Sequence, residues 1–440
     1  MKLLWLTPVH QGSAIARYSE LVLPCLIEKG CEVVVAATET NFVPSRRRPF
    51  LDLEILSVAD CLGDGFDQAF DAIVANFGDH YPNHALSLDV LRFSRLIGIF
   101  HDADMTNFSN GMRADGREAL GTTGEWPDGR EVTASIARLC AGSVAHSSFY
   151  RPVIARCDGP IDVIPLAWSL PSGVAEQRKL SLPGGGGGDK AFQVLTFGNI
   201  NWNKCADRVI EAIGAGPELR DATEYKLVGS IEPEERSRLC GLADRLGVRL
   251  VVAGPVNEDE LHRAVVEADV VSCLREPVLE GASASAIEAM LHGCAVLVSD
   301  AGFYAELPDE CVAKVLEATD VVSIRVALEK LFVDPGERSN MGRRGREYAE
   351  TVFSPDSYAD ALLRLIADVR VTSAYDPLIK RIASQLTDLG LSPDDSSIDF
   401  VLRALESMVP VARRASRGEK VISLTAPCAR NAEPIAAHAT

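Results

Sequence analysis

The chain has 440 residues, of which 47% are hydrophobic and 24% charged, and this ordinary composition excludes wholesale disorder. The length predicts two or three domains, each able to bury its own core. A formal net charge of −18 excludes a general nucleic-acid-binding protein, because such proteins need a large basic surface.

Cysteines and apolar runs indicate the compartment. The eleven cysteines form no Cys-x-x-Cys pair, which predicts reduced, mostly buried thiols rather than a disulfide framework or a zinc site. The apolar N-terminus is too short for a signal peptide, and no apolar stretch reaches the roughly 18–20 residues that cross a bilayer. We therefore expect a cytoplasmic protein. The triplet Arg46, Arg47 and Arg48 is either a solvated loop or a patch for peripheral contact with the inner face of a membrane.

The first half alternates short apolar strands with amphipathic helices, the pattern of a parallel sheet with both faces covered. A helix is predicted over residues 15–29, with Gly30 as its C-terminal cap. The strand candidates are Leu3–Leu6, Val33–Ala37, Ala72–Ala75, Leu96–Phe100, Ser143–His146 and Asp162–Ile164.

Five consecutive glycines interrupt this pattern, and residues 180–192 are predicted to be a flexible linker. The strand candidates that follow are Gln193–Phe197, Tyr225–Val228, Arg249–Val252, Val270–Cys273 and Val296–Ser299. Helical sequence is expected after Pro308 and through Tyr358–Val369, and residues 411–440 read as a loose tail. Two doubly wound halves joined by a hinge would place a ligand cleft at the carboxyl ends of both sets of strands.

Two candidate sites follow strands of the first half. Gly12 and Ser13 lie in a strand-to-helix turn that is either an ordinary turn or one where helix amides face a ligand. His101 comes directly after the run Leu96–Phe100, so it either points into the crevice as a neutral hydrogen-bonding group or caps the next loop.

Two candidate sites belong to the second half. Gly198 to Lys204 closes a strand and opens a helix, which places Lys204 to meet a phosphate. Glu280 and Glu288 stand in a small-residue loop and on the helix that follows it. The amides from Gly281 to Ser285 could hold an anion there, with Ser283 as N-cap. A capping box from Ser285 to Glu288 is the structural alternative for the second acid.

These residues resemble the retaining family 4 glycosyltransferases of GT-B architecture, in which two Rossmann-like domains face each other across a cleft. The resemblance covers roughly residues 1–370. It rests on the Glu-x7-Glu spacing of Glu280 and Glu288, the Gly198–Lys204 junction, Gly12-Ser13, and the phrase from Val298 to Pro308. Asn76-Phe-Gly-Asp with His84, followed by His101-Asp102, further resembles a bacterial branch that builds surface polysaccharide.

The resemblance implies domains at 1–179 for the acceptor and 193–355 for the donor, followed by helices over 356–410 that would cross back to the first domain. It implies that Glu280 holds the transferred sugar and Glu288 the ribose, while His101 touches the sugar from the opposite domain. The remaining donor-binding candidates are Gly12, Ser13, Asn199, Lys204, Arg275, Gly281, Ala282 and Ser283.

The chain departs from the family pattern at Asn199 and Cys205, where many members carry arginine and glycine. One phosphate-binding charge is therefore missing, and Arg275 is the candidate substitute. The expected donor is UDP- or GDP-linked and is a substrate, so no cofactor is predicted. No metal ligands are assigned, because no Asp-x-Asp metal motif is expected in the cleft segments. The departing phosphate itself would take the acceptor proton.

The predicted function is transfer of a hexose, such as mannose or glucose, to a glycan or lipid-linked saccharide in surface polysaccharide biosynthesis. A nucleotide-sugar epimerase of the same architecture is a second hypothesis, since it would use the same donor without an acceptor. A non-catalytic, glycosyltransferase-like binding subunit is a third. The joint presence of Glu280, Glu288, Lys204 and His101 favours an enzyme.

Overall fold

A computed structural model describes residues 1–40, 53–120, 126–155, 157, 159–171, 191–388 and 401. Internal contacts divide the chain into two units, Met1–Ser373 and Ala374–Thr440. Both sheets and the site described below lie in the first unit.

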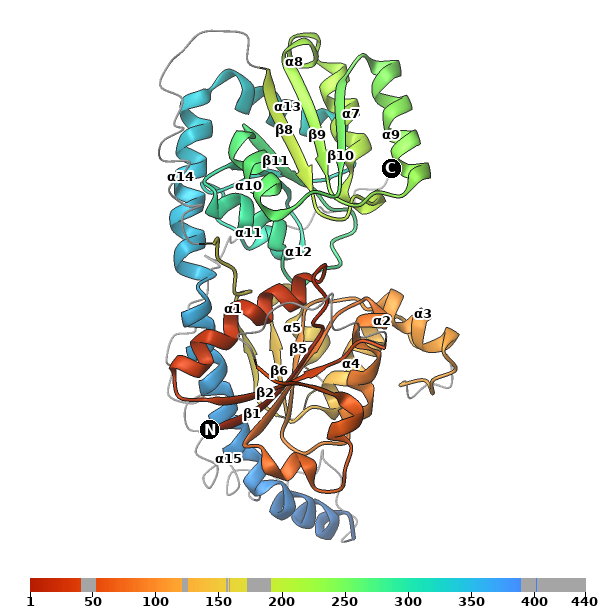
Figure 1. Ribbon diagram of the computed structural model, residues 1–440, viewed down its shortest axis with the longest axis vertical. Helices are drawn as coiled ribbons and strands as arrows, with labels where there is room; N and C mark the ends of the chain where they lie inside the picture. The colour runs from red at the N-terminus through yellow and green to blue at the C-terminus, as the bar shows by residue number, and fades with distance from the viewer. Residues whose placement is uncertain are drawn as a thin grey trace, which may run out of the picture. The chain divides into compact units, whose positions relative to one another are not determined.

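The first half of this unit is built on a parallel sheet (Figure 1). Among the described residues its strand order is β3-β2-β1-β4-β5-β6-β7. The strands are β1 Lys2–Thr7, β2 Glu32–Ala37, β3 Ile55–Ser57, β4 Ala72–Phe77, β5 Leu96–Phe100, β6 Gly142–Ala145 and β7 Ile161–Val163. The α-helices are α1 Ala14–Glu28, α2 Tyr81–His84, α3 Thr106–Ala114, α4 Gly129–Leu139 and α5 Arg151–Ile154, and the short 3-10 turns are η3 Val58–Cys61, η4 Phe66–Ala69, η5 Ala85–Val90 and η6 Ser148–Tyr150.

The second half repeats the design with a sheet of order β10-β9-β8-β11-β12-β13. Its strands are β8 Phe192–Phe197, β9 Thr223–Val228, β10 Arg249–Gly254, β11 Val270–Cys273, β12 Ala295–Ser299 and β13 Ala313–Val315. Its helices are η7 Trp202–Lys204, α7 Ala206–Ala215, α8 Pro217–Ala222, α9 Pro233–Leu246, α10 Glu258–Glu267, α11 Ala284–Leu291, α12 Gly302–Ala305, α13 Val321–Val333, α14 Pro335–Val352 and α15 Pro355–Asp388. The prediction of two Rossmann-like halves is confirmed.

The local sequence explains these elements. The central strands are continuous apolar runs that are buried along their length, as in β5 and β12, because helices cover both faces of a parallel sheet. Helix α1 begins where the Ser13 hydroxyl accepts a hydrogen bond from Ala16 N. It ends before Gly30, whose φ of +85° is a left-handed conformation that favours glycine.

Strand order fixes where a ligand can bind. In the first sheet β1 pairs with both β2 and β4, and in the second β8 pairs with both β9 and β11. The connections leave in opposite directions at these positions, so each sheet opens a crevice beyond the carboxyl ends of its central strands. The loops after β1, β5, β8 and β11 therefore contain the candidate site.

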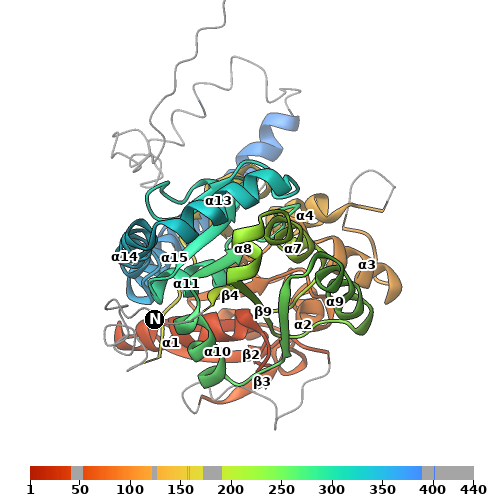
Figure 2. The same ribbon diagram turned by 90° about the horizontal axis from the view of Figure 1, so that it is seen from above.

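Helix α15 contacts the first half although it follows the second in sequence. Lys29, at the end of α1, forms ion pairs with Asp356 and Asp360 at 2.7 and 2.8 Å. The Tyr358 ring packs edge-on against Tyr18. One hydrophobic cluster includes residues of both sheets together with Tyr358 and its neighbours. Figure 2 shows α14 and α15 beside α11 and α1.

Some predictions differ from the structure. Strands β3 and β13 were not predicted, and β13 lies where helical sequence was expected to resume after Pro308. Both strands have three residues and occupy sheet edges, so neither has an apolar run that signals a strand. Residues 180–190 of the linker, the Arg46–Arg48 triplet and the tail 411–440 lie outside the described residues.

Two predictions about bulk properties can also be compared with the structure. The ten cysteines in the described part of the chain are all free thiols, and most are buried, as predicted. Among the same residues, no helix is both long enough and apolar enough to cross a bilayer.

Candidate functional site

A cleft of about 680 Å³ is lined by loops of both halves. The first half contributes the turn into α1, the loop after β4, and residues following β5, β6 and β7; the second contributes the loop after β8 and the segment leading into α11. The candidate residues that line it are Gly12, Ser13, His101, Asn199, Arg275, Glu280, Ala282 and Ser283. Lys204, Gly281 and Glu288 are not among its lining residues.

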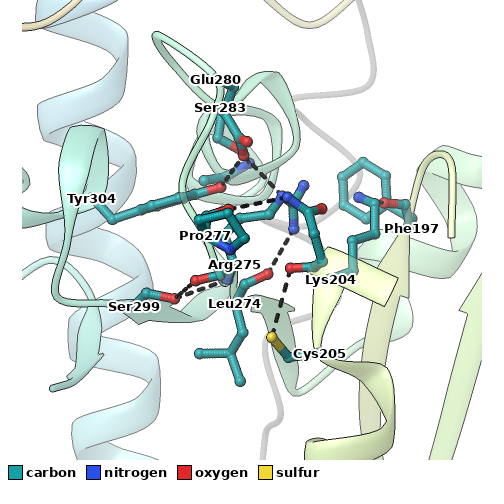
Figure 3. Close-up of polar contacts among 12 residues, drawn as sticks. Phe197, Lys204, Cys205, Leu274, Arg275, Pro277, Glu280, Ser283, Ser299 and Tyr304 are labelled. Carbon is teal, nitrogen blue, oxygen red and sulfur yellow. Dashed lines mark hydrogen bonds and ion pairs between the residues drawn. The ribbon is translucent and has the colours of Figure 1, made fainter. Parts of the chain in front are cut away.

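Glu280 is held by two partners (Figure 3). Arg275 Nε lies 2.8 Å from Glu280 Oε1, and the Tyr304 hydroxyl donates to the same oxygen at 2.7 Å. Ser299 Oγ accepts from Arg275 N and donates to Arg275 O, both at 2.8 Å, so the backbone of the arginine is fixed as well. Arg275 is only 7% exposed. Arg275, expected to replace a missing positive charge that binds phosphate, is thus paired with Glu280.

Lys204 does not line the cleft. Its Nζ donates to the carbonyl oxygen of Phe197 at 2.8 Å, and the side chain is buried (Figure 3). Burial, followed by the charge of Arg275, lowers the pKa of Lys204 to about 7. The Lys204 amine lies 3.3 Å from where a Cβ on Gly198 would be, and Gly198 has a φ of +97°. An anion beside Gly198 would therefore meet a lysine whose protonated, charged form it stabilises.

Cys205 explains one departure from the family pattern. It follows Lys204 with φ +51° and ψ 32°, the left-handed conformation that glycine adopts without strain. The backbone at this junction therefore has a conformation that a glycine would adopt more readily than a cysteine. The side chain is buried rather than directed to solvent.

The start of helix α11 faces the cleft. Ser283 is the N-cap, and its Oγ accepts a hydrogen bond from Ala286 N at 3.3 Å. The alternative capping box from Ser285 to Glu288 is therefore wrong, because Glu288 accepts a hydrogen bond from Trp168 Nε1 at 3.3 Å instead. Helix amides at Ala284 and Ser285 remain available to the cleft, where the helix dipole favours an anion.

The amide of Gly281 is already used. Gly281 N donates to His101 O at 2.7 Å, and its carbonyl accepts from Ser147 Oγ. A Cβ on Gly281 would approach the Tyr150 hydroxyl to 2.6 Å, so this glycine is required for close packing. The Gly281 amide, one of those expected to hold an anion, is thus hydrogen-bonded to His101 in the opposite wall of the cleft.

Glu288 lies behind the cleft wall. It is 4% exposed, and the indole of Trp168 occupies its Oε2. Arg17, on α1, lies with its Cζ 5.1 Å from the Trp168 ring and forms an ion pair with Glu258. Burial raises the pKa of Glu288, and the nearby charge of Arg17 opposes that shift. A ribose could reach this acid only by displacing the indole N–H.

His101 is one of two adjoining histidines. Its Nε2 lies 3.0 Å from Asn76 Oδ1, and its Nδ1 lies 3.2 Å from Nε2 of His146. Nδ1 of His146 lies 3.0 Å from Ile164 O. The Asn76 amide is oriented by its Nδ2, which donates to Leu6 O.

The two outer contacts of this pair are to oxygens that only accept, so each requires an N–H, and the inner contact requires a third. Three hydrogens on two imidazoles correspond to one positive charge. Burial, however, lowers the pKa of His101 well below its ordinary value and that of His146 to about 4. The neutral pair therefore lacks one hydrogen bond, and a neighbouring anion would favour the protonated form.

Asp102, Trp168, Tyr304 and His146 belong to the site but had no role assigned from the sequence. His146 directly follows β6, as His101 follows β5, so the rule that selected one could have found the other. Asp102 lines the cleft, and burial, followed by the charges of Asp79 and Glu280, raises its pKa to about 7. No sequence signal marks Tyr304 or Trp168, because each reaches its glutamate from a distant part of the chain.

The expectation that the cleft segments contain no Asp-x-Asp sequence is wrong, because Asp102-Ala103-Asp104 follows β5 and Asp102 lines the cleft. The two carboxylates have separate partners: Asp102 Oδ2 accepts from Asp79 N at 2.8 Å, and Asp104 Oδ1 accepts from Thr106 N at 3.1 Å. Among the described residues the group whose ligand atoms could hold a metal ion is elsewhere, at His262, Glu288 and His292.

Comparison with known proteins identifies the second half. Residues 185–348 match the family model described as "Glycosyl transferases group 1". A stretch of 165 residues is 29% identical to the MMP alpha-(1->4)-mannosyltransferase of Mycolicibacterium hassiacum. That stretch spans 37% of this chain and 37% of that enzyme.

Solved structures match both halves together. Sucrose-phosphate synthase from Thermosynechococcus elongatus has a TM-score of 0.61 at 17% identity, covering 83% of this chain and 98% of that one. Anabaena HepE in complex with UDP-glucose has a TM-score of 0.57 at 16% identity, covering 83% and 99%. The chain has the GT-B glycosyltransferase fold. Its group 1 domain contains Lys204, Arg275, Glu280 and Glu288, and the first half of this GT-B fold contains His101.

Proposed function

We propose that this protein transfers a hexose from a nucleotide-sugar to a saccharide acceptor with retention of anomeric configuration. The observation that carries the proposal is that Glu280 and the start of α11 line the same cleft as His101, which comes from the other half. Two walls that meet at this point can hold the diphosphate on one side and the sugar between them. The group 1 domain match supports the transfer of a glycosyl group.

The donor diphosphate would bind at the amino end of α11. Its oxygens would accept from the amides near Ser283 and would draw Lys204 from the Phe197 carbonyl. Arg275 lies on the same wall, and its guanidinium would add to the positive potential. Charge grows on the diphosphate as it departs, so these fixed groups stabilise the transition state more than the ground state. That HepE is described in complex with UDP-glucose supports a UDP- or GDP-linked donor.

The sugar would lie between Glu280 and His101. Both contacts of Glu280 use Oε1, which leaves Oε2 for sugar hydroxyls. His101 would touch the sugar from the opposite wall, and burial favours its neutral form in the absence of donor. Glu288 would bind the ribose after the Trp168 indole moves aside.

The acceptor would approach along the first half. The bond between the sugar's anomeric carbon and the diphosphate oxygen breaks, and its electron pair stays on the phosphate. The acceptor oxygen bonds to the anomeric carbon, and its proton passes to the departing phosphate. The resemblance to a polysaccharide-building branch, carried by Asn76-Phe-Gly-Asp and His84, favours a glycan or lipid-linked saccharide acceptor in surface polysaccharide biosynthesis. The transfer would need no metal ion and would take place at or near the inner face of the membrane.

The test is a transfer assay on the full chain with UDP- and GDP-linked glucose and mannose, with and without oligosaccharide acceptors. We expect one donor to give an acceptor product whose anomeric configuration, measured by NMR, matches that of the donor. The same donor should give only slow hydrolysis without acceptor. A changed sugar on the nucleotide without acceptor would identify an epimerase. Nucleotide binding without turnover of any donor would identify a binding subunit.

A further inference from the structure

Three buried side chains converge behind the α11 wall. His262, on α10, has its Nδ1 3.1 Å from Nε2 of His292, the residue that caps the end of α11. The same Nδ1 lies 3.7 Å from Glu288 Oε1. All three residues are buried, between 2% and 4% exposed, and their ligand atoms lie within 4.8 Å of one another.

One carboxylate oxygen in this cluster is buried without a hydrogen bond. Glu288 Oε1 has no hydrogen-bond partner, although the side chain is almost fully buried. An uncompensated buried carboxylate is costly. The positive charge of Arg17 acts on Glu288, but the Arg17 side chain contacts Glu258 and the face of the Trp168 ring. The carboxylate oxygen therefore lies 3.7 Å from Nδ1 of His262 and accepts no hydrogen bond.

The geometry of the three atoms suits a small metal ion. Zinc binds imidazole nitrogen at about 2.0–2.1 Å, which places two tetrahedral ligands roughly 3.3 Å apart. The separations of 3.1 and 3.7 Å lie on either side of that value. Two imidazoles and a carboxylate are also a ligand set that zinc accepts. The cluster sits at the carboxyl end of α11, where the helix dipole favours a cation.

We propose that His262, Glu288 and His292 form a binding site for a divalent transition-metal ion such as Zn²⁺, and that the bound ion withdraws Glu288 from the donor. The second part rests on the proposed function, in which Glu288 binds the ribose. Metal and nucleotide-sugar would then be mutually exclusive, and the ion would inhibit transfer. A carboxylate coordinated to zinc through Oε1 cannot turn freely to the cleft.

The first experiment measures the site without any nucleotide. Chelator-treated full chain is titrated with Zn²⁺ by calorimetry and with Co²⁺ by visible spectroscopy, since cobalt reports a tetrahedral site. We expect one ion per chain and a loss of affinity of roughly 10-fold or more in each of His262→Ala and His292→Gln. His80→Gln, which changes an exposed histidine of the first half, should bind as the wild type does. Circular dichroism confirms that each variant is folded.

The opposite result has a simple structural reading. One imidazole N–H shared between the second imidazole and Glu288 Oε1 would also account for the separations of 3.1 and 3.7 Å. The absence of stoichiometric binding, or binding that survives in both cluster variants, overturns the metal site in favour of this hydrogen bond.

The second experiment measures the linkage. UDP-dependent thermal shifts are recorded with and without saturating Zn²⁺, in the wild type and in His292→Gln. Because UDP itself binds zinc, the variant in the same mixture corrects for chelation in solution. We expect the apparent UDP affinity of the wild type to fall at least 10-fold beyond the change seen in the variant. Zinc binding without this fall overturns the linkage alone. The same shifts are recorded with GDP, and failure of both nucleotides to bind either protein counts against the proposed function and leaves the zinc titration to decide the site.

Discussion

Two helix starts face the same cleft, and they differ in what already occupies them. Helices α1 and α11 both begin after a strand-loop segment, and both have a serine N-cap, Ser13 and Ser283. At α1 the carboxylate of Glu39 accepts from the amides of Val9 and His10. At α11 the adjacent carboxylate, Glu280, is instead paired with an arginine and a tyrosine.

A helix start can bind an anion only when its neighbours leave it room and add no opposing charge. The amides of Gly12 and Ser13 are also used locally, since both donate to atoms of His10. With a carboxylate already beside it, the α1 start repels a second anion. Gly12 and Ser13 line the cleft, and this comparison favours α11 over α1 as the helix start that would hold the diphosphate in the proposed function.

The largest expected effect comes from the carboxylate that differs between the two starts. Glu280→Gln should lower kcat for transfer roughly 100-fold or more, about 2.7 kcal/mol, because a sugar hydroxyl loses its charged partner. Glu39→Gln, the matched change at α1, should lower stability but leave transfer within about 10-fold. Steady-state kinetics of both variants, with melting temperatures, make the comparison. Equal losses in the two variants would remove Glu280 from its role.

The second prediction places a new charge at the first residue of each helix. Ala284→Glu should lower UDP affinity roughly 10- to 100-fold, because a carboxylate at that position repels the diphosphate. Ala14→Glu should change it little. Glutamate is favourable at a helix start, so neither change should unfold the protein. Isothermal titration with UDP decides the matter, and a stronger effect from Ala14→Glu would move the diphosphate to α1.

The sequence predicted most of this framework because strands such as Leu96–Phe100 and Val270–Cys273 are short apolar runs that alternate with longer helical segments. It also predicted that Glu280, Ser283 and His101 face one cleft, since residues after parallel strands share an edge. Pairings between distant segments could not be read from the sequence. Tyr304 with Glu280, Trp168 with Glu288, and His146 with His101 each depend on how loops fold over the sheets.

The third prediction concerns the lysine beside α11. With its pKa lowered to about 7, Lys204 is mostly neutral above that pH in the free protein, and a bound diphosphate restores its charge. UDP binding should therefore take up protons, and affinity should fall as pH rises from 7 to 9, by up to about 10-fold per unit. Calorimetry in two buffers of different ionisation enthalpy measures the uptake.

The lowered pKa of Lys204 also makes the stability of the protein depend on pH. Its folded pKa lies below its unfolded value, so between about pH 7 and 10 the unfolded chain binds more protons, and this residue's contribution to the unfolding free energy rises with pH. Lys204→Met should abolish both the proton uptake and this pH dependence. A variant that still takes up protons on binding UDP would show that another group, such as the His101–His146 pair, is responsible.

The smallest expected effect is at Trp168, whose indole occupies the glutamate assigned to the ribose. Trp168→Phe keeps an aromatic ring beneath Arg17 but removes the N–H that donates to Glu288 Oε2. The ribose would then displace no hydrogen bond, so UDP should bind about 2- to 5-fold more tightly, in keeping with the roughly 0.5–1 kcal/mol net value of one such bond. Stability should fall by a similar free energy. UDP and UMP share the ribose, whereas inorganic diphosphate lacks it, so affinity for diphosphate should be unchanged. An equal gain for all three would mean that the indole obstructs the cleft as a whole and that Glu288 has no special part in recognising the nucleoside.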